Sequence, residues 1–403
     1  MLALVNLTPA LDVALLGAAL AVLPASWVAW RGRRQGLRGW PAWQRVLTVA
    51  TLFLTLDLVV FGAFTRLTDS GLGCPDWPGC YGELSPLQAH GHISAAQALV
   101  PDGPVTHSKA WIEMAHRYLA TAVGALITAL MLLAWRMRRA GGLSPWWATA
   151  TFVWVCAQGA FGALTVTLKL QPIVVTGHLL GAVLGVGLLM AQVRVLSPAQ
   201  PLRDAAWALS GLRRLGWATL GLLVLQIASG AWVSTNYAVL ACAEFPMCQG
   251  QWWPDTDFSA AFRLMRPLGG DGESGYLTLA GLTAIHLVHR CLAMGVALAL
   301  AFYAWRLHGW KPSTGRGRPW QTEGRVLAGL LLWQLASGLS NVVLGWPLAA
   351  ALAHTLGAAL LVAWLVRLLV LPRAPGAVHA PQCADPQRPH QGHHGGAVHP
   401  TAS

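Results

Sequence analysis

Two stretches of the chain share a pattern: Trp111-Ile-Glu-Met-Ala-His-Arg117 and Thr283-Ala-Ile-His-Leu-Val-His-Arg290. Each opens a long apolar run, and a second histidine follows it in a later apolar run, His178 after the first stretch and His354 after the second. Ionisable side chains are costly inside a membrane, so they indicate functional sites. Two matched pairs predict two metal sites, and two axial imidazoles per site suit haem iron. The predicted ligands are His116, His178, His289 and His354.

The composition is that of an all-α integral membrane protein. Hydrophobic residues make up 55% of the 403 residues and charged residues only 10%. Several apolar runs are long enough to cross a bilayer as helices. The net charge of +12 comes mostly from arginines that cluster between the apolar runs. This placement follows the positive-inside rule and argues against a nucleic-acid partner.

The apolar runs predict nine spans. Arginines follow residues 10–30 and no basic segment precedes them, which indicates an uncleaved helix rather than a signal peptide. Alternating loop charges place the N-terminus outside and the C-terminus in the cytoplasm. The predicted spans are residues 10–30, 43–65, 111–135, 147–168, 173–194, 215–237, 278–305, 325–346 and 349–369.

Spans two to five resemble spans six to nine. Three groups of residues recur in the same order, which indicates duplication of a four-helix unit. Because each unit has an even number of spans, we expect two tandem bundles related by a pseudo-two-fold axis along the membrane normal. The recurring groups are Gly62, Cys74 and Cys80 with Gly230, Cys242 and Cys248; His116-Arg117 with His289-Arg290; and Gln158, Gly162 and His178 with Gln334, Gly338 and His354.

This repeat predicts four parts. Residues 1–40 hold the extra N-terminal helix and a basic cytoplasmic loop, and residues 41–200 form the first half. Residues 201–373 form the second half. Residues 374–403 are rich in Pro, Gly, Gln and His with few apolar residues, which is typical of a disordered tail.

Four of the seven cysteines lie in loops that the charge pattern places outside, Cys74 with Cys80 and Cys242 with Cys248. Each pair has the same spacing. Paired loop cysteines suit an oxidising compartment. The topology and the cysteine usage therefore agree on which side is outside.

One asymmetry separates the halves. Glu113 precedes His116 by three residues and shares its helix face, whereas the matching position in the second half is His286. A carboxylate beside a haem site can move protons, so this difference predicts chemistry in the first half and electron transfer or structure in the second. A salt bridge from Glu113 to Arg117 is the alternative interpretation. We also expect Arg117 and Arg290 to meet haem carboxylates.

The motif Thr65-Arg-Leu-Thr-Asp-Ser-Gly-Leu-Gly-Cys-Pro-Asp-Trp-Pro-Gly-Cys80, with Glu113-Met-Ala-His-Arg117 and Gly177-His-Leu-Leu-Gly181, resembles heme A synthase. The resemblance covers about residues 43–370. It implies an oxidoreductase that converts the C8 methyl of heme O to a formyl group for cytochrome oxidase, in the bacterial cytoplasmic membrane.

The resemblance also implies residue roles. His116 and His178 would hold heme O as substrate, with Glu113 as the functional carboxylate, and His289 and His354 would hold heme B. Cys74 would pair with Cys80 and Cys242 with Cys248. The family core has eight spans, so residues 10–30 add a ninth.

Two other functions remain open at this stage: a di-haem b-type electron carrier, and a haem transporter or chaperone. For the synthase, either His116 or His178 leaves the iron during turnover or the oxidant is made otherwise. The family suggests heme O synthase and cytochrome oxidase assembly factors as partners. The sequence leaves the electron donor and self-association open.

Overall fold

The computed structural model describes residues 8–197, 207, 210–266, 277–310 and 318–372. Nine helices in this part are long and apolar enough to cross a membrane, which confirms the predicted spans. Most extend a few residues beyond the predicted bounds, because polar residues continue the helix past the apolar run. They are α1 (Thr8–Arg34), α2 (Trp40–Leu67), α4 (His107–Arg136), α5 (Pro145–Thr167), α6 (Pro172–Val195), α8 (Gly211–Thr235), α10 (Leu279–Gly309), α11 (Arg318–Val343) and α12 (Leu348–Leu369).

The helix starts follow from the local sequence. Proline is the first residue of both α5 and α6. Because proline has no backbone N–H, it leaves no unpaired donor at the start of the helix. The hydroxyls of Thr106 and Thr278 cap α4 and α10 by accepting hydrogen bonds from backbone N–H groups. These caps fix where each histidine-bearing helix begins. Three short elements, α3 (His90–Leu99), η1 (Ala238–Ala241) and α9 (Phe258–Ala261), lie in the long loops.

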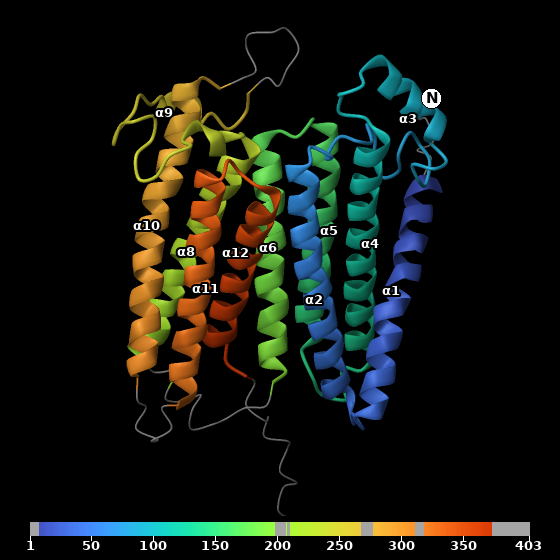
Figure 1. Cartoon of the computed structure of the whole chain (residues 1–403). Coiled ribbons are helices and arrows are strands. Elements are labelled where there is room, and N and C mark those ends of the chain that lie inside the picture. Colours follow the sequence, from blue (N-terminus) through green and yellow to red (C-terminus); the bar gives the residue numbers. More distant parts are fainter. Residues whose placement is uncertain (1–7, 198–206, 208–209, 267–276, 311–317, 373–403) are drawn as a thin grey trace, which may run out of the picture.

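The helices form two rings of neighbours. In the first, α2, α4, α5 and α6 each contact the next, and α6 contacts α2 again. In the second, α8, α10, α11 and α12 contact in the same cyclic order. The pairs α4 with α6 and α10 with α12, which carry the histidines, therefore face each other across their rings. The loops with α3 and α9 extend from the same end of the helices (Figure 1).

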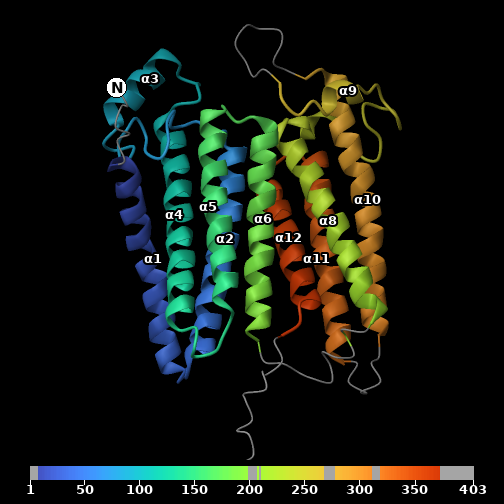
Figure 2. The same cartoon turned by 180° about the vertical axis from the view of Figure 1, so that it is seen from behind.

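Helices α6 and α12 lie side by side where the two rings meet, as both views show (Figure 2). Across this boundary α6 contacts α8 and α12, and α12 contacts α2, so the contacts are equivalent when the rings are exchanged. Buried Val186 of α6 and Leu361 and Val362 of α12 belong to the largest apolar core, which fills the boundary. The apolar core thus joins the two halves.

At the loop end, equivalent residues of the two halves meet. Arg66 donates to the carbonyl oxygen of Ser234 at 2.7 Å, and the Tyr237 hydroxyl donates to Asp69. Ser234 and Tyr237 occupy the positions in the second half that Arg66 and Asp69 occupy in the first. Burial raises the pKa of Tyr237, against the opposing effect of Arg66, so the hydroxyl keeps its proton at neutral pH.

The extra helix α1 contacts only α4 and α2 among the described elements. It crosses α4 closely, since a methyl group at Gly17 would come 2.3 Å from the Thr121 side chain. The predicted tail, residues 374–403, lies outside the described residues.

Candidate functional site

The four predicted histidines lie on α4, α6, α10 and α12, toward the loop end of each helix. His178 and His354 each lie six residues after the first residue of their helices. Helices α4 and α6 face each other across the first ring, and α10 and α12 face each other across the second. The structure therefore brings together the histidines of each predicted pair, across α4 and α6 in one half and α10 and α12 in the other.

A glycine of a neighbouring helix lies against each of the four imidazoles. A Cβ atom at Gly230 would come 2.9 Å from His289 Cε1, and one at Gly338 would come 2.9 Å from His354 Cε1. These glycines keep space beside each imidazole that a side chain would fill. The other two pairs are Gly62 with His116 and Gly162 with His178.

The second-half imidazoles are hydrogen-bonded. Ser229 Oγ lies 2.8 Å from His289 Nδ1, and Ser337 Oγ lies 3.1 Å from His354 Nδ1. The amide nitrogen of Gln334 lies 3.2 Å from His354 Nε2. The second pair thus has polar partners that restrict the rotation of both rings.

The first-half imidazoles have no hydrogen bonds of this kind among the described residues. Phe61 stacks on His116 with ring centroids 6.4 Å apart. The buried Nδ1 of His178 has no hydrogen-bond partner among the described residues. Phe161 packs beside Gly177, the residue before His178. These contacts do not restrain the rings as the second-half hydrogen bonds do.

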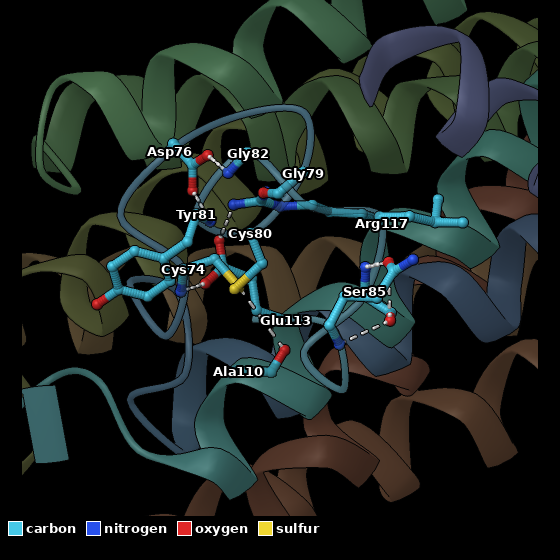
Figure 3. Close-up of a disulfide and its surroundings, with 12 residues drawn as sticks. Cys74, Asp76, Gly79, Cys80, Tyr81, Gly82, Ser85, Ala110, Glu113 and Arg117 are labelled. Atoms are coloured by element: carbon cyan, nitrogen blue, oxygen red, sulfur yellow. Dashed lines mark hydrogen bonds and ion pairs between the residues drawn. A yellow bond between two sulfur atoms is a disulfide. The ribbon is translucent and has the colours of Figure 1, made fainter. Parts of the chain in front are cut away.

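Glu113 and Arg117 connect the histidine helix of the first half to its cysteine loop (Figure 3). Both are buried and they form an ion pair. The other Glu113 oxygen accepts a hydrogen bond from the Cys74 backbone N–H at 2.8 Å. Arg117 also donates to the carbonyl oxygens of Pro78 and Gly79. The alternative expected from the sequence, a Glu113–Arg117 salt bridge, is therefore present.

The second half repeats the arginine contact without the carboxylate. Arg290 donates to the carbonyl oxygens of Cys242, Glu244 and Met247. His286, which replaces Glu113, faces the carbonyl oxygen of Ala238 through Nδ1 at 3.1 Å. Both arginines thus bind loop carbonyls, and their contact with haem carboxylates stays a prediction.

Disulfides close both loops, Cys74 with Cys80 and Cys242 with Cys248. In the first loop, the Asp76 carboxylate accepts hydrogen bonds from the backbone N–H groups of Tyr81 and Gly82. The loops are thus structured caps over the histidine helices.

Sequence reasoning missed the residues that contact the imidazoles. A short pattern marks them: Gln-x-x-Ser-Gly at 226–230 and 334–338, Gln-x-x-Phe-Gly at 158–162, and Leu-x-x-Phe-Gly at 58–62. Its four copies lie on α2, α5, α8 and α11 and end at the four glycines described above. A search for repeats shorter than the four-helix unit finds them.

These features define a class: a helical membrane protein with two matched pairs of histidines beneath disulfide-closed loops. Residues 45–366 match the family model COX15-CtaA, cytochrome oxidase assembly protein. The chain belongs to this family.

Similar proteins include several heme A synthases. That of Shewanella oneidensis is 39% identical over 321 residues, which cover 79% of this chain and 93% of the relative. That of Halalkalibacterium halodurans is 25% identical, with 77% and 90% covered, and that of Rhizorhabdus wittichii is 27% identical, with 78% and 89% covered. The family expected from the sequence motifs is confirmed.

Proposed function

We propose that this protein is a heme A synthase, an oxidoreductase that converts the C8 methyl group of heme O to a formyl group by successive hydroxylation. The observation that carries the proposal is the pair of matched histidine sites, of which only the first has a buried carboxylate, Glu113, on its histidine helix. Membership of the cytochrome oxidase assembly family and similarity to heme A synthases support it. The product would serve cytochrome oxidase assembly.

The residues present fit haem. Among the described residues no cluster of three or more His, Cys, Asp or Glu side chains has metal-binding geometry. Because the porphyrin itself would supply most of the ligands of haem iron, two histidines per site would suffice to hold the group, and each of the four imidazoles has space beside its ring. Iron supplies the oxidising chemistry that no side chain can provide.

Each half has a separate role in the proposal. His116 and His178 bind and orient heme O, and His289 and His354 bind a resident heme B. Glu113 moves protons beside the substrate and, through Cys74, holds the cysteine loop over the site. Arg117 and Arg290 hold the loops that cover each site and keep water from it.

The proposed setting is the bacterial cytoplasmic membrane. We assign the two rings of helices to two tandem four-helix units related by a pseudo-two-fold axis, with α1 as an addition. The disulfide loops and the haem sites face the outside, and the arginine-rich helix ends face the cytoplasm. Heme O synthase and cytochrome oxidase assembly factors are the proposed partners.

The test is to analyse extracted haem from cells that supply heme O, comparing wild type with Glu113→Gln. Glutamine keeps an oxygen that accepts the Cys74 N–H bond but cannot carry a proton. We expect heme A from the wild type, and bound heme O or its alcohol from the variant.

Other outcomes separate the alternatives. Heme B alone in both proteins would indicate a di-haem electron carrier, and freely exchanging haem without an oxidised product would indicate a transporter. Normal heme A output from Glu113→Gln would remove the proton-transfer role and leave Glu113 as a residue that holds the loop.

A further inference from the structure

The short pattern that ends at each of the four glycines differs between the two halves at the position just before the glycine. Phe61 and Phe161 occupy it in the first half, and Ser229 and Ser337 occupy it in the second. Each of the four immediately precedes one of the glycines that face the imidazoles. Both exchanges run in the same direction, from phenylalanine to serine, and so concern both ligands of each site.

The serines determine the tautomer of the second-half histidines. Ser229 Oγ lies 2.8 Å from the carbonyl oxygen of Gln226, one helical turn earlier, and 2.8 Å from His289 Nδ1. A serine hydroxyl has a single proton, and inside a helix it is commonly donated to a carbonyl of the preceding turn. Oγ is therefore placed to accept the Nδ1 proton of His289. The Gln226 amide nitrogen, which lies 3.1 Å from Nδ1 and 3.3 Å from both Nε2 and the His289 carbonyl oxygen, then donates to one of these two acceptors, and Nε2 is the nitrogen that a metal would take.

The same arrangement occurs at the second ligand. Ser337 Oγ lies 2.8 Å from the carbonyl oxygen of Trp333 and 3.1 Å from His354 Nδ1. The Gln334 amide nitrogen lies 3.2 Å from Nε2, which fits an unprotonated Nε2, and a metal bound there would take the place of this amide. An imidazole held in this way is oriented and is a stronger base, and both effects strengthen metal ligation.

The first-half site provides no such acceptor. A phenyl ring cannot accept the Nδ1 proton as a hydroxyl does, and the buried His178 Nδ1 has no partner in the described chain. The His116 ring is stacked on Phe61, a contact that does not select a tautomer. These imidazoles are free to lose a metal bond at lower cost.

We propose that Ser229 and Ser337 are positioning residues that make the second site a permanent haem site, whereas Phe61 and Phe161 make the first site releasable. The inference deepens the proposed function, on which it rests, because a synthase must retain its cofactor but exchange substrate for product. The side chains at these four positions then decide which half is the cofactor site.

The first experiment measures haem transfer from the purified full chain, loaded with heme B, to excess apomyoglobin. We expect two phases, with the slow phase absent in His354→Ala. Ser229→Ala and Ser337→Ala should accelerate the slow phase about 10- to 100-fold and leave the fast phase unchanged. Ser229→Thr, which keeps a hydroxyl, should restore the slow phase.

Ser340→Ala is the matched control. Ser340 lies one turn after Ser337 on α11, and its hydroxyl donates only to the carbonyl oxygen of Ala336. It should transfer haem as the wild type does. A slow phase equally unaffected in Ser229→Ala, Ser337→Ala and Ser340→Ala would overturn the proposal.

The reverse exchange tests the first site by a gain of retention, which misfolding cannot produce. Phe161→Ser should slow the fast phase about 10-fold or more, and the exposed Phe53→Ser on α2 should not. An unchanged fast phase in Phe161→Ser would contradict the role of the phenylalanines.

Both readouts use heme B and need no oxidation. Heme A production with equal retention in both sites would therefore reject this inference alone. Two different retention phases without heme A production would reject the proposed function alone.

Discussion

The two halves have the same helix arrangement but different side chains around their histidines. In the first half, charge is buried on the histidine helix itself as the Glu113–Arg117 pair, and Phe61 stacks on the His116 imidazole. In the second, His286 replaces the carboxylate and serines hold the imidazoles. Two rings with the same order of helices thus differ in a few side chains around their histidines.

The largest expected effect comes from removing one ligand in each half. His354→Ala should abolish stable haem binding in the second half, whereas His178→Ala should leave that haem in place. Counting haem per chain after purification checks this difference, with His286→Ala as a control that retains haem. Equal loss in His178→Ala and His354→Ala would mean that the two sites are not distinct.

The second-largest expected difference is in stability, between Arg117→Ala and Arg290→Ala. Arg117→Ala leaves the buried Glu113 carboxylate without its partner, so we expect a loss of about 3–5 kcal/mol in the free energy of unfolding. Arg290→Ala removes hydrogen bonds to loop carbonyls and a cation–π contact with Phe245 but leaves no buried charge unpaired, so we expect about 1–3 kcal/mol. Unfolding of the two variants in detergent gives the comparison. Equal losses in the free energy of unfolding would show that the Glu113–Arg117 ion pair contributes no stability beyond the contacts of Arg117 with the loop.

The glycines give the smallest difference. At Gly338 a Cβ atom would come 2.9 Å from His354, but at Gly162 it would come only within 3.7 Å of His178. Gly338→Ala should therefore displace the imidazole at a cost of about 1–3 kcal/mol, and Gly162→Ala should be tolerated. Haem retention and thermal stability measure both, and a more disruptive Gly162→Ala would contradict the geometry.

The number of membrane-spanning helices in the described chain was predictable from the sequence for physical reasons, whereas the four histidines as haem ligands stay a prediction. Hydropathy and arginine placement depend on local composition, and the duplication supplied an internal control for each assignment. Membrane histidines are rare enough to mark a site by themselves.

The second contacts of the site were not predictable in the same way. Arg117 and Arg290 were expected at haem carboxylates, but the loop carbonyls that they bind are brought close only by the folded path of the loop. Ser229 and Phe61 appear as ordinary helix residues until α8 and α2 are placed beside the histidine helices.

The position of α1 affects how lipid-soluble molecules can reach the first half from the bilayer. Within the described chain, α1 packs along α4 and α2 and has no counterpart on the second half, while α5 contacts only α4 and α6. Helix α1 therefore covers the boundary between α2 and α4 against a hydrophobic porphyrin that diffuses in the bilayer. The boundaries on either side of α5 have no further described membrane-spanning helix against them, so under the proposed function they are where we expect substrate to enter the first half.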